Sequence, residues 1–122
     1  MKSGLLLTQR ALGDIQDLFA HSKDLWGKAT ADKYLNAIER ALARLQEQPN
    51  LLQEDPELHS ALKFYRVNKH LLVCDAQSTS IVVLAVIHAS MDIPARLSEL
   101  QPMLSTEVEL LHEKLRPRKP RE

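Results

Sequence analysis

The chain has 122 residues, which is enough for one domain and too few for two ordinary ones. Its composition, 44% hydrophobic and 26% charged, is typical of a globular protein and excludes the disordered and collagen-like classes. Sixteen basic residues balance sixteen acidic ones, which argues against a protein whose main task is to bind phosphate backbones. We therefore expect a single core and no direct binding to nucleic acid.

We expect neither a membrane span nor a secretion signal in this sequence. Its longest apolar run, Ile81 to Ile87, is far shorter than the roughly 18 residues needed to cross a bilayer. A cytoplasmic protein without membrane attachment is expected. The one cysteine, Cys74, cannot form an internal disulfide or a cysteine-rich metal site, and its position in a strand-like segment predicts an inert buried thiol.

The first segments predict a short strand and a helix. Gly4 to Leu7 can form the strand, and Thr8 is a plausible N-cap for the helix that follows. Apolar residues then recur at three- and four-residue steps, which indicates a helix of about four turns with one apolar face. Gly27 is expected to end this helix.

A second helix follows after a few residues. Thr30 or Asp32 can cap its start, and Pro49 with Asn50 is expected to end it. Because the connection is so short, the two helices should form an antiparallel helical hairpin whose apolar faces share one core surface.

The second half of the chain predicts a small antiparallel sheet. Residues 50 to 60 contain Pro56 and several acids and amides, and are expected to form a loop. In the first strand, alternation places Leu62 and Phe64 on one face and Tyr65 and Val67 on the other. The third strand is apolar on both faces, which predicts the central strand of the sheet, covered by the helices on one side and by the C-terminal part on the other. The expected strands are 61–67, 70–75 and 81–88.

The C-terminal region predicts helices and a tail. Asp92 can cap a short helix, and Thr106 to Glu109 fits a capping box for a second one. We expect an amphipathic helical extension over 101–116, which either covers the sheet or mediates a homo-oligomer, and a flexible basic tail over 117–122.

Most catalytic signatures are absent from the sequence. The three glycines form no phosphate-binding loop, and the five histidines are dispersed, so neither nucleotide hydrolysis nor a metal or other cofactor is expected. RNA cleavage by a cluster of cations needs no motif, because RNA can supply its own 2′-hydroxyl as nucleophile. The residues that could form such a site are Lys63, Arg66, Lys69, His70 and His88. The same cations are also typical of a solvated strand edge that discourages edge pairing.

The order of these segments resembles the ParE/RelE superfamily of bacterial toxins from type II toxin-antitoxin systems. Three stretches carry the resemblance: Ala-Asp-Lys-Tyr-Leu-Asn-Ala-Ile at 31–38, Tyr-Arg-Val-Asn-Lys-His-Leu-Leu at 65–72, and the run from Ile81 to Arg96. The resemblance covers about residues 3 to 100. It implies an α+β fold in which a short strand and a helical hairpin precede a three-stranded meander (β-α-α-β-β-β), with a toxin domain over 1–100.

Within this superfamily the ParE-like branch fits better. The RelE-like branch cuts messenger RNA on the ribosome with basic residues and often a C-terminal Arg and Tyr, whereas this chain has no Tyr after the last predicted strand. The ParE-like branch implies inhibition of DNA gyrase without catalysis, and neutralisation by a cognate antitoxin. A RelE-like ribonuclease using Lys63, Arg66, His70 and His88, and a non-toxic adaptor on the same fold, remain as alternatives.

The resemblance also implies two surfaces. The target surface would hold Lys63, Arg66, Lys69, His70, His88 and Arg96. The antitoxin would lay apolar side chains against Trp26, Tyr34, Leu35 and Leu42.

Overall fold

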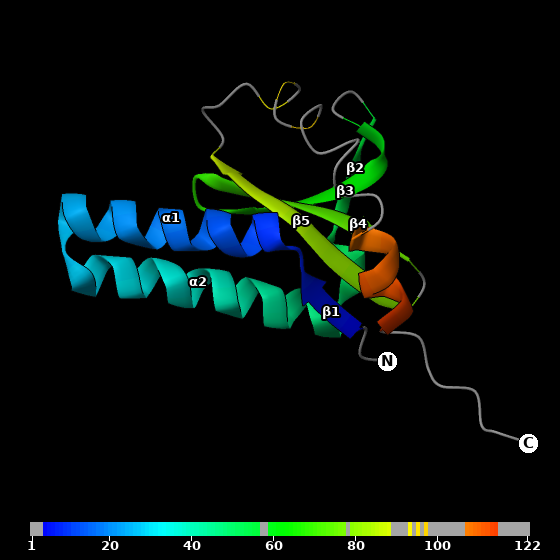
Figure 1. The fold of residues 1–122 in the computed structure, drawn as a ribbon, viewed down its shortest axis with the longest axis horizontal. Coiled ribbons are helices and arrows are strands. Elements are labelled where there is room, and N and C mark those ends of the chain that lie inside the picture. The colour runs from blue at the N-terminus through cyan, green and yellow to red at the C-terminus, as the bar shows by residue number, and fades with distance from the viewer. Residues whose placement is uncertain are drawn as a thin grey trace, which may run out of the picture.

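The computed structural model describes residues 4–56, 59–77, 79–88, 93, 95, 97 and 107–114, apart from the side chains of 59 and 60. Figure 1 shows two long helices packed side by side against a curved sheet. The predicted α+β class and helical hairpin are confirmed. The elements in chain order are β1 (Gly4–Leu7), α1 (Gln9–Trp26), α2 (Lys28–Glu47), a 3-10 turn (Pro49–Leu51), β2 (Gln53–Asp55), β3 (His59–Val67), β4 (His70–Ala76) and β5 (Ser80–His88). Residues 107–114 form a further helical segment.

The five strands form one sheet in the order β1-β5-β4-β3-β2. The pairs β2–β3, β3–β4 and β4–β5 are antiparallel. The pair β1–β5 is parallel, and Leu5 lies opposite Ile81 in it. Every residue of β5 except His88 is buried. The prediction that this strand is apolar and buried on both faces is therefore confirmed, but β4 rather than β5 is the middle strand of the five, because β2 extends the far edge.

The helical hairpin begins as the sequence predicts but turns differently. Oγ1 of Thr8 accepts a hydrogen bond from the Ala11 amide, so Thr8 is the N-cap of α1. Gly27 adopts a φ of 89°, a conformation that glycine reaches without strain, and ends α1. The prediction that Thr30 or Asp32 caps α2 is wrong, because α2 starts at Lys28, directly after Gly27. A single residue thus joins the helices.

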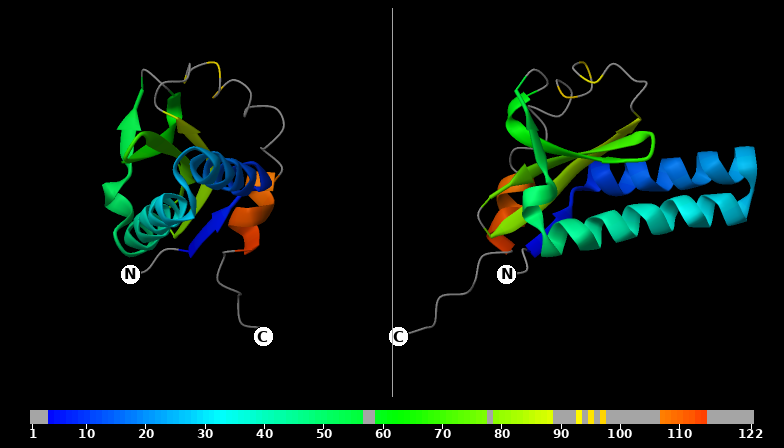
Figure 2. Two further views of the ribbon diagram at one scale, coloured as in Figure 1. Left: turned by 90° about the vertical axis from the view of Figure 1, so that its left-hand side faces the viewer. Right: turned by 180° about the vertical axis from the view of Figure 1, so that it is seen from behind.

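Side-chain alternation divides the core into two parts. One part lies between the helices and the sheet and includes Ile38 and Leu45 of α2 with Leu72 and Val83 of the sheet. The other lies on the opposite face and joins Phe64 to Val108 of the C-terminal helical segment. Both predictions, the alternation in β3 and a C-terminal cover over the sheet, are confirmed for these residues. Figure 2 shows the segment 107–114, in orange, on the side of the sheet away from α2.

Two details of the sheet differ from prediction. The expected loop over 50–60 contains β2, which pairs with β3 through Gln53 and Phe64. Three polar residues on a sheet edge are held by backbone pairing, so no apolar pattern marks them. In addition, the register between β4 and β5 shifts after Val73, and Leu84 is the extra residue of a bulge on β5.

The remaining predictions for the ends of the chain fall largely outside the described residues. These include the Asp92 cap, Arg96, residues 101–106 and the basic tail over 117–122. None of the helices that the structure describes is long and apolar enough to cross a membrane.

Candidate functional site

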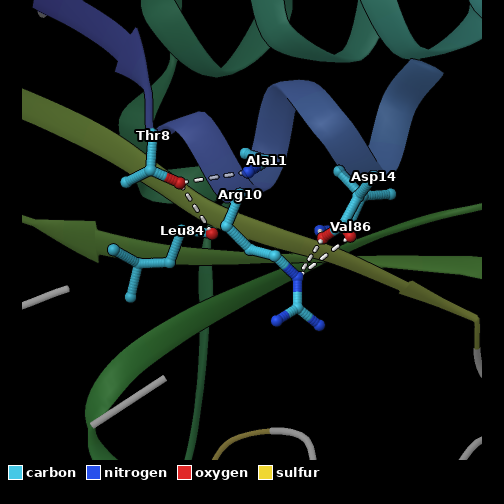
Figure 3. Close-up of polar contacts among 6 residues, drawn as sticks. All are labelled: Thr8, Arg10, Ala11, Asp14, Leu84 and Val86. Carbon is cyan, nitrogen blue, oxygen red and sulfur yellow. Dashed lines mark hydrogen bonds and ion pairs between the residues drawn. The ribbon is translucent and has the colours of Figure 1, made fainter. Parts of the chain in front are cut away.

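The start of α1 is fixed to β5 by polar contacts that involve the bulge (Figure 3). The Thr8 hydroxyl donates a hydrogen bond of 2.8 Å to the carbonyl oxygen of Leu84, while accepting the capping bond from Ala11. The Thr8 amide donates to the carbonyl oxygen of Val83 at 3.0 Å. Because β1 ends at Leu7, Thr8 takes over the pairing of β5 at the point where the parallel strand stops.

Asp14 continues this attachment along α1. Its Oδ2 accepts the backbone N–H of Val86 at 3.0 Å, and Nε of Arg10 donates to its two oxygens at 3.0 and 3.3 Å. Figure 3 shows the carboxylate lying between the Arg10 guanidinium and β5. Arg10 and Asp14, one helical turn apart, therefore form a charge-assisted pair. This pair covers part of the β5 edge beyond the end of β1.

A groove of about 650 Å³ opens beside this attachment, between α1 and the ends of β4 and β5. Two histidines from the sheet, His70 and His88, lie opposite each other in neighbouring strands, and their rings meet edge to face at 4.9 Å. The other lining residues come from α1 and β5: Asp14, Asp17, Leu18, His21 and Val86.

His70 is the most perturbed titratable group of this groove. Burial, together with the neighbouring His88, lowers the pKa of His70 from 6.5 to about 4. Its Nδ1 shares a hydrogen bond of 2.5 Å with the Tyr34 hydroxyl of α2, and the two rings pack edge to face. His70 is thus neutral at pH 7 and contacts α2 and β5 at once.

The predicted target-surface residues do not form one cluster. Lys63 lies on the helix-facing side of β3, 3.9 Å from a carboxylate oxygen of Glu54. Val67 is the residue of β3 that pairs with His70, and Lys63 lies four residues before it. Lys63 is therefore about 13 Å from the His70 position along the strand. Arg66 and Lys69 are exposed near the β3–β4 turn, where Nε of Arg66 donates to the carbonyl oxygen of Asn68. The structure therefore brings His70 and His88 together and leaves Lys63 apart from them. Arg96 is not among the described side chains.

The four residues expected to contact an antitoxin differ in exposure. Trp26 is 63% exposed and lies at the end of α1, beside Leu25 at 57%. Tyr34 and Leu42 are half-buried and pack against the core, and Leu35 is half-buried. Only Trp26 therefore presents most of its surface for a partner to cover.

Several contacts were not predicted from the sequence. The spacing of Arg10 and Asp14 is a helical i, i+4 pair that could have been found, but its partner Val86 lies 72 residues away. Ser80, His112 and Asp75 form a second polar cluster, in which Nδ1 of His112 lies 2.7 Å from the Ser80 hydroxyl. In the described part of the chain, no three metal-ligating side chains lie close enough to hold an ion.

Comparison with known proteins gives a consistent result. The family described as "ParE toxin of type II toxin-antitoxin system, parDE" matches residues 5–93. The chain is 27% identical over 95 residues to toxin ParE of Escherichia coli, covering 77% of this chain and 92% of that toxin. It is 24% identical over 91 residues to toxin ParE1 of Caulobacter vibrioides, covering 75% and 94%. A solved structure titled "Chromosomal ParDE TA system from P. aeruginosa" superposes with a TM-score of 0.64 at 18% identity, covering 73% of this chain and 98% of that one.

Proposed function

Because the chain belongs to the ParE toxin family of type II toxin-antitoxin systems, we propose that it inhibits DNA gyrase in the cytoplasm and is neutralised by a cognate antitoxin. The family match over residues 5–93 is the observation that carries this proposal. The proposal assigns no catalytic residue to the protein.

The arrangement of the cations supports a non-catalytic toxin over a RelE-like ribonuclease. A ribonuclease of that kind needs cations and a proton-transfer residue around one phosphodiester. Here Lys63 is about 13 Å along the sheet from His70, and alternation directs Arg66 toward the opposite face from Lys63. The equal numbers of acidic and basic residues also favour a protein target.

The exposed end of the helical hairpin supports an antitoxin partner. Trp26 and Leu25 lie where the hairpin extends beyond the sheet, as Figure 1 shows for the far ends of α1 and α2. Exposed large apolar side chains are typical of surfaces that a partner covers. We propose that Trp26 is an anchor for the antitoxin, that Leu35 makes a further contact two turns into α2, and that Tyr34 and Leu42 mainly support the surface from the core.

A supercoiling assay with purified gyrase tests the target. The wild-type protein should inhibit ATP-dependent supercoiling, and its expression without antitoxin should stop growth with filamentation and DNA damage signalling. Reversal of two cations, Lys63→Glu with Arg66→Glu, should weaken the inhibition while the protein stays folded. The matched control is Lys23→Glu with Lys28→Glu, two exposed cations near the hairpin end.

Three results would contradict the proposal. Full supercoiling activity in the presence of the folded toxin would exclude gyrase as the target. Prompt translational arrest with cut transcripts would favour the ribosome-dependent ribonuclease, and normal growth on expression would favour a non-toxic adaptor.

A further inference from the structure

A second, smaller groove lies between α2 and the last residues of β3 and has a volume of about 210 Å³. Arg40 and Arg44, one turn apart on α2, line one wall, and Arg66 lines the other. Ala37 and Ala41 leave room between the arginines, and Tyr65 adds an aromatic side chain. The groove therefore combines the two guanidinium groups of α2 with small and aromatic surface. Arg66, whose Nε donates to the carbonyl oxygen of Asn68, lies at its β3 rim, and no acidic residue lines the groove.

Two cations of the described chain have acidic partners, unlike the three arginines. Arg10 is paired with Asp14, and Lys63 lies beside Glu54. Among the residues that the structure describes, no carboxylate forms a salt bridge with Arg40, Arg44 or Arg66. All three are exposed. Positive charge that is not neutralised along a groove attracts an anionic ligand, and guanidinium groups suit carboxylates through paired hydrogen bonds.

The strand beside the groove favours an extended ligand. The pairing of β3 with β2 ends at Phe64, so Tyr65 to Val67 pair only with β4 among the described strands. Arg40 and Arg44 are separated by about 6 Å along the helix axis. Carboxylates at alternate positions of an extended segment are about 6.6 Å apart, which matches this spacing.

We propose that this groove binds an extended acidic segment of a partner protein, with carboxylates at alternate positions paired to Arg40 and Arg44. Because side chains alternate along an extended segment, the residue between the two acids points away from α2, and Arg66 adds positive charge at the β3 rim of the groove. A phosphate backbone is the less suitable ligand, because the chain has no net positive charge and the groove is short and partly apolar. This inference specifies a chemistry of recognition that neither the family assignment nor a gyrase target implies.

Fluorescence anisotropy with the full chain tests the proposal. The probe is a fluorescein-labelled peptide that contains Glu-Leu-Glu, compared with the same peptide carrying Gln at both Glu positions. The test variant is Arg40→Gln with Arg44→Gln, and the matched control is Lys28→Gln with Lys33→Gln, which removes two exposed charges from the same helix. Circular dichroism and the melting temperature verify that each variant is folded.

The wild-type protein should bind the acidic peptide at least about tenfold more tightly than the Gln peptide, and the arginine variant should lose about tenfold in affinity. The lysine control should change affinity less than about twofold. Equal affinity for both peptides, no binding by the wild type, or an unchanged arginine variant would overturn the proposal. Tighter binding of a labelled single-stranded DNA of about 12 nucleotides, lost in the same arginine variant, would assign the groove to nucleic acid instead.

Discussion

Asp14 joins α1 to a strand residue 72 positions further along the chain. Its side chain is 17% exposed, and it accepts both the Val86 amide and the Arg10 guanidinium. A carboxylate in this position satisfies a backbone donor of β5 beyond the end of β1. When such a partner is removed, the donor loses its acceptor in a site that water reaches poorly, which costs more than the bond itself contributes.

Replacement of Asp14 by Ala should therefore lower the free energy of unfolding by about 1–3 kcal/mol. Asp17→Ala is the matched control, since Asp17 is exposed on the same helix and the same substitution changes helix propensity equally. The control should stay within about 0.5 kcal/mol of the wild type. Urea denaturation measures both variants, and equal unfolding free energies would show that the Asp14 contacts contribute nothing to stability.

At the scale of elements, the C-terminal helical segment is attached by polar as well as apolar contacts. His112 is buried, with Nδ1 at 2.7 Å from the Ser80 hydroxyl and Nε2 at 3.3 Å from a carboxylate oxygen of Asp75. Ser80 begins β5 and Asp75 lies near the end of β4. Glu107 of the same segment accepts the Gln9 amide at the start of α1 at 2.8 Å. One short helical segment thus contacts three elements.

Replacement of His112 by Ala should release this segment before the rest of the fold. It leaves the buried Ser80 hydroxyl without this partner, which costs about 1–3 kcal/mol. Amide hydrogen exchange within 107–114 should accelerate about tenfold or more. Leu110→Ala is the control on the same segment, because Leu110 is 56% exposed and should leave exchange nearly unchanged. If the two variants exchange alike, the histidine contacts do not hold the segment.

These elements also show how far the sequence predicts the fold. Thr8, Gly27 and the alternation from Leu62 to Val67 act through local geometry, so their roles are correctly predicted. The start of α2 was misplaced because Gly27 both ends α1 and precedes α2, which needs no side-chain cap. Contacts between distant positions, such as Thr8 with Leu84, have no local signal, and the bulge that exposes this carbonyl is not visible in the apolar run of β5.

The candidate site was predicted less completely than the fold for the same reason. The proximity of His70 and His88 follows from the meander, but the contribution of α1 to their groove depends on how the hairpin crosses the sheet. In the sequence, Arg40 and Arg44 have the pattern of ordinary exposed positions on an amphipathic helix. Only the packing of α2 beside the end of β3 brings them near Arg66.

For the molecule as a whole, His70 lies where the two layers meet. It contacts Tyr34 of α2 through a hydrogen bond and His88 of β5 through its ring. Asp14, Asp17 and His21 of α1 line the same groove. The contact between helices and sheet at this end therefore depends on a histidine that must stay neutral, since burial and His88 lower its pKa to about 4.

The free energy of unfolding should accordingly fall on acidification, because His70 gains a proton in the unfolded chain at a higher pH than in the folded protein. His70 titrates at 6.5 when unfolded and at about 4 when folded, so its contribution is complete above pH 6.5, declines between 6.5 and 4, and is constant below. Allowing for partial exposure of the ring, the loss is on the order of 2 kcal/mol. Urea denaturation at a series of pH values measures this loss of stability.

His70→Gln should flatten the plot of unfolding free energy against pH in this interval, whereas His21→Gln, at an exposed position of the same groove, should leave the decline intact. An equally steep decline in the His70 variant would assign the acid sensitivity to other groups.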